Sequence, residues 1–98
     1  AEFSLALRDD GVLYAWGIDE TGQLGQGRPL GMSNVPLVVP GLPPIRDMDG
    51  GWGLGHALAV GQDGSLWAWG RNNAGQLGDG TRVDRNTPVQ VMPPLSIP

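Results

Sequence analysis

The sequence contains no cysteine and no lysine, and its six basic residues are arginines spread along the chain. Without cysteine, the chain forms neither disulfides nor thiolate metal sites, although this does not identify a compartment. Binding to a phosphate backbone needs clustered Lys and Arg, whereas this chain has ten acidic residues and a formal net charge of −4. We therefore expect neither nucleic acid nor an anionic membrane as a partner.

Long hydrophobic runs and helical periodicity are also missing. No apolar run approaches the length that spans a membrane, and no signal peptide is visible. The stretches without glycine and proline lack a 3.6-residue apolar period. In their place the chain has 17 glycines and 9 prolines, which stand between short apolar segments. This pattern is typical of turns between short strands and predicts an all-β fold.

The sequence contains the same pattern twice, at a distance of 53 residues, as Gly11 and Gly64 illustrate. Residues 5–17 return as 58–70, and the glycine-rich residues 22–27 return as 75–80. Self-similarity at this period predicts stacked supersecondary units, none of which buries its apolar face alone.

Each copy is predicted to form four short antiparallel strands. An Asp-Gly pair separates the first two, and it indicates a hairpin because the turn needs a residue at positive φ. Proline is expected to open the third strand, where its missing amide donor costs least. The expected strands are 4–8, 12–16, 36–39, 45–48, 56–60, 65–69, 88–91 and the start of one at 95–97. Four strands in about fifty residues is typical of a propeller blade, so the chain should hold about two blades.

Four motifs follow one another in the sequence: Asp-Gly-x-Leu-aromatic-Ala-Trp-Gly, Gly-Gln-Leu-Gly-x-Gly, Pro-x-x-Val, and Gly-Gly followed by His-x-Leu-Ala. The first three occur twice, and the fourth occurs once, since Phe3 stands at the position equivalent to His56. This succession resembles the regulator of chromosome condensation repeat. One complete copy covers 10–60, a second and incomplete copy covers 63–98, and residues 3–7 resemble the tail of a preceding copy. We therefore expect the single segment 1–98 to be a piece of a longer propeller.

The resemblance implies a seven-bladed ring used as a binding platform. Members of the family include a nucleotide exchange factor for the small GTPase Ran, modules attached to ubiquitin ligases and a secreted inhibitor of β-lactamases. The family shares a fold rather than a function, so none of these activities transfers automatically.

Three features invite a chemical interpretation. The two Gly-Gln-Leu-Gly loops lack the Lys and the helix of a phosphate-binding loop, and we expect tight turns whose Leu24 and Leu77 enter the core. Asp47 and Asp49 resemble the start of a calcium loop without its downstream Glu. His56, the only histidine, has no nucleophile in a recognisable motif, and we expect a hydrogen-bonded structural role. The sequence thus predicts no catalytic residue, no cofactor and no metal, and the chain is not expected to be an enzyme.

Aromatic residues at repeated strand positions, Trp16, Trp67 and Trp69, are expected to pack between blades. Trp52 differs because it lies in a glycine-rich turn outside these positions. It is either an exposed anchor for a partner or a side chain folded back over the edge of the blade.

Loops that differ between the two copies are the other candidates for binding, since segments freed from the demands of the fold are where function concentrates. The candidate contact residues are Trp52, Leu54, Arg28, Leu30, Met32, Arg82, Val83 and Arg85.

The sequence favours a non-enzymatic scaffold that binds a protein partner through its inter-strand loops. The alternative is a self-assembling unit, a homo-oligomer that closes a ring, because two blades leave apolar surface and strand edges open. Exchange-factor-like activity is less favoured because the segment is acidic and lacks a basic tail. A propeller enzyme with carboxylates in a central channel is less favoured because the sequence shows no catalytic constellation.

Overall fold

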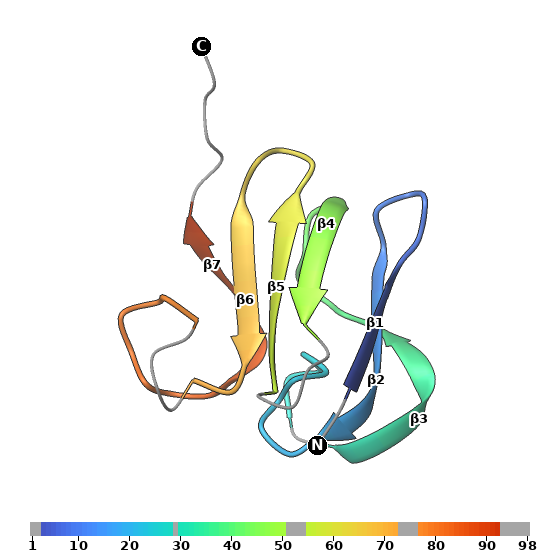
Figure 1. Cartoon of the computed structure of the whole chain (residues 1–98), viewed down its shortest axis with the longest axis vertical. Helices are drawn as coiled ribbons and strands as arrows, with labels where there is room; N and C mark the ends of the chain where they lie inside the picture. Colours follow the sequence, from blue (N-terminus) through green and yellow to red (C-terminus); the bar gives the residue numbers. More distant parts are fainter. Residues whose placement is uncertain (1–2, 29, 51–54, 73–76, 93–98) are drawn as a thin grey trace.

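The protein is described by a computed structural model that covers residues 3–28, 30–50, 55–72 and 77–92, and these residues form two antiparallel sheets (Figure 1). The first sheet has the order β1-β2-β3, with β1 at Phe3–Leu7, β2 at Leu13–Asp19 and β3 at Gly31–Val38. The second has the order β4-β5-β6-β7, with β4 at Ile45–Gly50, β5 at His56–Gly61, β6 at Leu66–Gly70 and β7 at Arg85–Met92. No described residue belongs to a helix long and apolar enough to cross a membrane.

Both Asp-Gly pairs form the expected hairpins. Gly11 and Gly64 have φ values of 88° and 86°, which side chains other than glycine rarely adopt. The preceding aspartate completes each turn, because Asp10 Oδ1 accepts from the Val12 amide at 3.2 Å and Asp63 Oδ1 from the Ser65 amide at 3.0 Å.

The third strand of each copy begins earlier than predicted. β3 starts at Gly31 and β7 at Arg85, so the expectation that proline opens these strands is wrong. Pro36 lies inside a bulge: the register passes from Ala15↔Leu37 to Gly17↔Ser33, and residues 34–36 face Trp16 alone. Because the ladder is already interrupted there, the missing amide of proline removes no ladder hydrogen bond. The strand expected at 95–97 lies outside the described residues.

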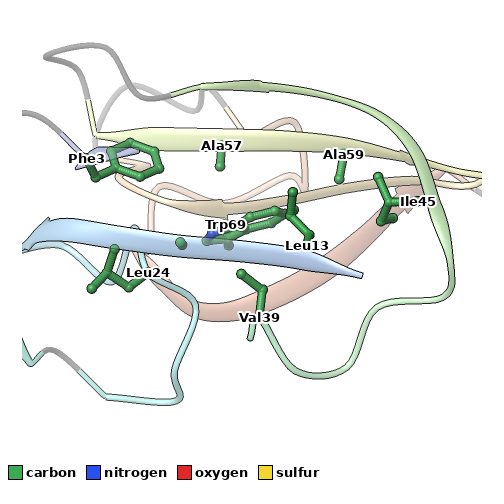
Figure 2. Packing of buried hydrophobic residues seen from close by; sticks show 9 residues of the cluster. Phe3, Leu13, Leu24, Val39, Ile45, Ala57, Ala59 and Trp69 are labelled. Carbon is green, nitrogen blue, oxygen red and sulfur yellow. The ribbon is translucent and has the colours of Figure 1, made fainter. Parts of the chain in front are cut away.

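The two sheets stack face to face, and the core lies between them (Figure 2). Alternation along β5 turns Ala57 and Ala59 into this interface, where their small side chains leave room for the neighbouring sheet. The buried cluster consists of Phe3, Leu13, Ala15, Leu24, Val39, Ile45, Ala57, Ala59 and Trp69.

Trp69 ties the two sheets together. Its side chain is fully buried, and its Nε1 donates to the backbone oxygen of Gln23 in the other sheet's loop at 2.9 Å. Trp67 lies on the same face and packs against the cluster. Trp16 lies on the face of β2 opposite to Leu13 and Ala15 and is partly exposed, so it does not pack between these two sheets. Its packing against a further blade stays a prediction.

Candidate protein-interaction surface

The loop between β2 and β3 is organised by the buried carboxylate of Asp19, the last residue of β2. Its Oδ1 accepts from the Leu24 amide at 3.0 Å, and its Oδ2 accepts from the Leu30 amide at 2.7 Å. These two bonds hold the loop around the fully buried Leu24 and fix the point from which β3 departs. They provide acceptors for two backbone amides that lie outside the sheets and have no acceptor on a neighbouring strand.

Asn72 takes the same place in the loop between β6 and β7, and it is also fully buried. Its Oδ1 accepts from the Leu77 amide at 3.1 Å, while its Nδ2 donates to the backbone oxygens of Thr81 at 3.1 Å and Val83 at 2.9 Å. The prediction that Leu24 and Leu77 enter the core is therefore confirmed. Asp19 and Asn72 were not among the predicted residues, although an Asp or Asn recurs three residues before each glycine-rich segment.

Asp79 reinforces the second loop. Its Oδ1 accepts from the Thr81 hydroxyl at 2.7 Å, and its Oδ2 accepts from Arg85 Nε at 2.8 Å. The hydrogen bond from the Thr81 side chain, followed by that from Arg85, holds the pKa of Asp79 well below its ordinary value of 3.8. Arg85 is thus engaged in the fold, although 33% of its side chain is exposed, and its contact with a partner stays a prediction.

The other predicted contact residues differ in their exposure to solvent. Arg28, Met32, Arg82 and Val83 are exposed, with relative exposures of 62% for Met32 and 57% for Val83. Leu30 is half-buried because its amide is bound to Asp19. Trp52 and Leu54 lie outside the described residues.

Both loops lie at the same end of the two sheets, in the lower part of Figure 1, and the first loop contacts the first residues of β7 there. The Gly27 amide donates to the backbone oxygen of Asn86, at the start of β7, at 2.8 Å. Gly22 approaches the same strand so closely that a Cβ on it would lie 2.8 Å from the Asn86 Cα. The first loop therefore adjoins the start of β7, directly after the second loop. We call the two loops together the loop end (residues 20–28, 30 and 77–84).

The remaining titratable groups are not gathered into a chemical site. In the described ranges, no group of three or more His, Cys, Asp and Glu side chains is placed to hold a metal ion. Nδ1 of His56 is buried and has no hydrogen-bond partner in the part of the chain that the structure describes, so the expected hydrogen bond is absent at this atom. Asp10 pairs with Arg8 at 2.6 Å, and this hydrogen bond lowers the pKa of Asp10.

A second exposed feature lies on β3. Val35 and Val38 are 55% and 50% exposed and continue the apolar surface that begins at Met32. Val38 also lines a pocket of about 290 Å³ whose walls include Val12 and residues 39–44. Met32 was among the contact residues predicted from the sequence, whereas Val35 and Val38 were not.

Residues 10–60 and 63–97 match the family model of the Regulator of chromosome condensation (RCC1) repeat. The chain belongs to the RCC1 repeat family. It is 40% identical over 95 residues to the ultraviolet-B receptor UVR8 of Arabidopsis thaliana and 38% identical over 91 residues to the human E3 ubiquitin-protein ligase HERC2. The matches cover 96% and 93% of this chain but only 21% and 2% of those proteins.

Solved RCC1-type structures have the same fold. Prp20p of Saccharomyces cerevisiae, described with its binding properties to Gsp1p and histones, superimposes with a TM-score of 0.80 at 23% identity, over 94% of this chain and 24% of that one. Human WBSCR16 superimposes with a TM-score of 0.72 at 27% identity, over 91% of this chain and 23% of that one. A further structure shows yeast RCC1 (Prp20) bound to Kap60. The all-β propeller fold is therefore confirmed, and it is one that supports protein interaction in general.

Proposed function

We propose that this chain is part of a non-enzymatic scaffold that binds a partner protein through the loop end. One observation carries the proposal: the buried networks around Asp19 and Asn72 hold two adjoining loops in place while leaving Arg28, Arg82 and Val83 exposed at their surface. Arginines and apolar side chains on a preorganised surface are suited to protein recognition, because little conformational entropy is lost on binding.

The named relatives are consistent with a partner that is a protein. Prp20p is described with binding to Gsp1p and histones, and yeast RCC1 was solved with Kap60. The match to HERC2 covers 2% of that ligase, so its activity gives no reason to assign catalysis to this chain.

The test is a selection of ligands from a phage-displayed library of random peptides against the 98-residue chain. Amide chemical shifts of the isotope-labelled chain then locate each selected peptide. We expect the shift changes to concentrate at the loop end and along the strands that leave it. The double substitution Arg82→Ala with Val83→Ala should weaken the peptides bound at the second loop, whereas Arg46→Ala, at an exposed position of β4, should not. A failure to select any saturable ligand, or shift changes confined to other surfaces, would refute the proposal.

Self-assembly is a second candidate, and the partly exposed Trp16 favours it. Its counterpart Trp69 is fully buried against the other sheet, so the face that carries Trp16 is shaped to receive a further blade, which a second copy can supply. Light scattering during size-exclusion chromatography distinguishes the cases. A mass of two or more chains that falls to one chain in Trp16→Ala supports assembly through this face, and a monomer in both proteins excludes it.

A further inference from the structure

Aspartate directly precedes glycine at four places in this chain, at Asp10, Asp49, Asp63 and Asp79. Such a pair is open to an internal reaction in which the glycine nitrogen attacks the aspartate carboxyl carbon, because glycine has no side chain that obstructs the approach. In a folded chain the carboxyl group and the nitrogen must also be free to move toward each other. The fold restrains three of these pairs and leaves the fourth free.

The pair in the first hairpin is held at both reacting groups. Arg8 donates two hydrogen bonds to the carboxylate of Asp10, at 2.9 Å and 2.6 Å, and the Val12 amide donates a third at 3.2 Å. The Gly11 nitrogen donates to the Arg8 oxygen at 2.9 Å. The turn and all of these bonds would have to open before the nitrogen could reach the carboxyl carbon.

The two pairs of the second copy are held as well. Asp63 Oδ1 accepts from the amide and the hydroxyl of Ser65, and the Gly64 nitrogen donates to the Gly61 oxygen at 2.9 Å. The carboxylate of Asp79 accepts hydrogen bonds from three side chains, those of Thr81, Arg85 and Asn72. These bonds lower the pKa of Asp79 and keep it ionised, and an ionised carboxylate is a poor target for a nucleophile.

Asp49 and Gly50, the last two residues of β4, lack such restraints. The side chain of Asp49 is exposed, and no described residue donates a hydrogen bond to it or forms an ion pair with it. Asp47, two residues earlier, does bind a backbone group, since its Oδ1 accepts from the Met48 amide at 2.9 Å. The carboxyl group of Asp49 is therefore free to rotate.

The backbone nitrogen of Gly50 is also free. Because the Gly61 amide bonds to the Ser65 oxygen in the second hairpin, alternation along β5 directs the backbone groups of Ala57 toward β6 and those of Leu58 toward β4. Gly50 lies opposite Ala57, so its nitrogen points away from β5. β4 is an edge strand, and in the described part of the chain no backbone oxygen accepts from this nitrogen.

We propose that Asp49 is a modification site, at which aspartate isomerises to isoaspartate in the folded chain. The Gly50 nitrogen attacks the Asp49 carboxyl carbon, a succinimide ring closes, and one carboxyl oxygen leaves as water. A water molecule then opens the ring at the former main-chain carbonyl. The main chain now continues through the Asp49 Cβ, and the α-carboxylate becomes free. Water lost in the first step is regained in the second, so the reaction needs no other reagent, and it is independent of the scaffold role.

The conformational change that the reaction requires is small. The carbonyl group of Asp49 must turn so that the Gly50 nitrogen approaches the carboxyl carbon, and this interrupts the pairing of Asp49 with Leu58. That pairing stands near the end of an edge strand, where local opening costs little. The other three pairs would lose a turn or a carboxylate network as well.

The product would alter the contact between the two sheets. Gly50 is packed so closely that a Cβ on it would lie 3.0 Å from Leu5 Cδ1 in β1 and 3.1 Å from the His56 oxygen. Isoaspartate adds a carbon atom to the main chain directly before Gly50. Gly50 cannot then keep this place while Asp49 stays opposite Leu58, so β4 should loosen from β1 as the protein ages.

The experiment is an incubation of the folded 98-residue chain at mildly acidic pH in water labelled with heavy oxygen. Each passage through the succinimide introduces one labelled oxygen atom, and proteolysis in ordinary water followed by fragmentation in a mass spectrometer locates it. We expect Asp49 to take up label at least about tenfold faster than the three restrained aspartates. In concentrated urea, which removes the restraints, the four rates should lie within about threefold of one another.

Two controls identify the reaction. Asp47 is exposed but precedes Met48, so its labelling measures direct exchange of carboxyl oxygen and should stay at background. Asp49→Glu keeps the charge at an exposed position, but its longer side chain closes a ring far more slowly. Stored wild-type chain should therefore yield a second peptide of equal mass and different retention in chromatography, and the variant should not.

Either of two results overturns the proposal. One is labelling of Asp49 in the folded chain that is no faster than that of Asp47. The other is equal labelling at all four Asp-Gly pairs of the folded chain, because the reaction would then pass through global unfolding rather than through the free end of β4.

Discussion

The two copies of the repeat place the same residues in different surroundings. Trp69 is fully buried, whereas its counterpart Trp16 is partly exposed, and Leu13 is 2% exposed whereas Leu66 is only half-buried. The difference comes from the neighbouring sheet, because only the face of each sheet that packs against the other sheet is buried. Burial in a repeat protein is thus a property of the position in the stack rather than of the residue.

The largest expected change in the free energy of unfolding comes from substituting the two tryptophans separately. Trp69→Ala should lower the free energy of unfolding by about 3–5 kcal/mol, because it empties a filled site between the sheets. Trp16→Ala should cost less than half as much, since part of that ring already contacts water. Urea denaturation followed by circular dichroism measures both. Trp69→Phe, which keeps a ring but loses the bond to the Gln23 oxygen, serves as the milder variant, and equal losses at both positions would contradict the comparison.

The buried polar residues of the two loops provide the next test. Asn72→Asp should lower the free energy of unfolding by about 3 kcal/mol or more, because a carboxylate would face the backbone oxygens of Thr81 and Val83. The penalty should shrink as the pH falls, since repulsion and burial raise the pKa of the new carboxyl group and its protonated form donates a hydrogen bond. Asp19→Asn should cost less, about 1–3 kcal/mol, by turning an amide group toward a backbone donor. Thermal unfolding across pH measures both variants, and an Asn72→Asp protein as stable as wild type at neutral pH would refute the assignment.

Much of this architecture could be predicted from the sequence because its signals are local. Asp-Gly turns, alternating apolar residues and the repeated Gly-Gln-Leu-Gly motif each specify a conformation within a few residues. The bulges at Pro36 and Pro88 could not be predicted in the same way, because a register shift depends on the neighbouring strand. The exposure of Val35 and Val38 was missed for a related reason: only the alignment of β3 with β7 reveals that Thr87 and Gln90 suffice at those positions.

Glycines at matched positions of the two copies separate the conformational cost of a side chain at positive φ from the cost of overpacking. Gly25 and Gly78 have nearly the same φ, 70° and 72°. A Cβ on Gly25 would lie 2.9 Å from Val39 Cγ1, whereas one on Gly78 would meet no atom of the described residues within 4 Å. Gly78→Ala should therefore show the conformational cost alone, about 1–2 kcal/mol. Gly25→Ala should lose about 1–3 kcal/mol more through overpacking against Val39 and, across the interface, against the Trp69 ring at 3.3 Å. Chemical denaturation of both variants gives the difference, and equal losses would mean that the first loop does not press against its neighbour as described.

The smallest expected effect concerns the acid sensitivity of the second loop. Hydrogen bonds from Thr81 and Arg85 lower the pKa of Asp79 below 3.8, so the ionised form is favoured by folding. The stability that this carboxylate contributes is present above its unfolded pKa and is lost as the pH falls from about 4 toward its folded pKa. The Thr81 amide donates to Asp79 Oδ1, and the Val83 amide donates to the Thr81 hydroxyl. The protection of these two amides from exchange should therefore fall as the pH drops below about 4, and Asp79→Asn should abolish this pH dependence. A pH dependence that persists in Asp79→Asn would show instead that acid acts on the fold as a whole.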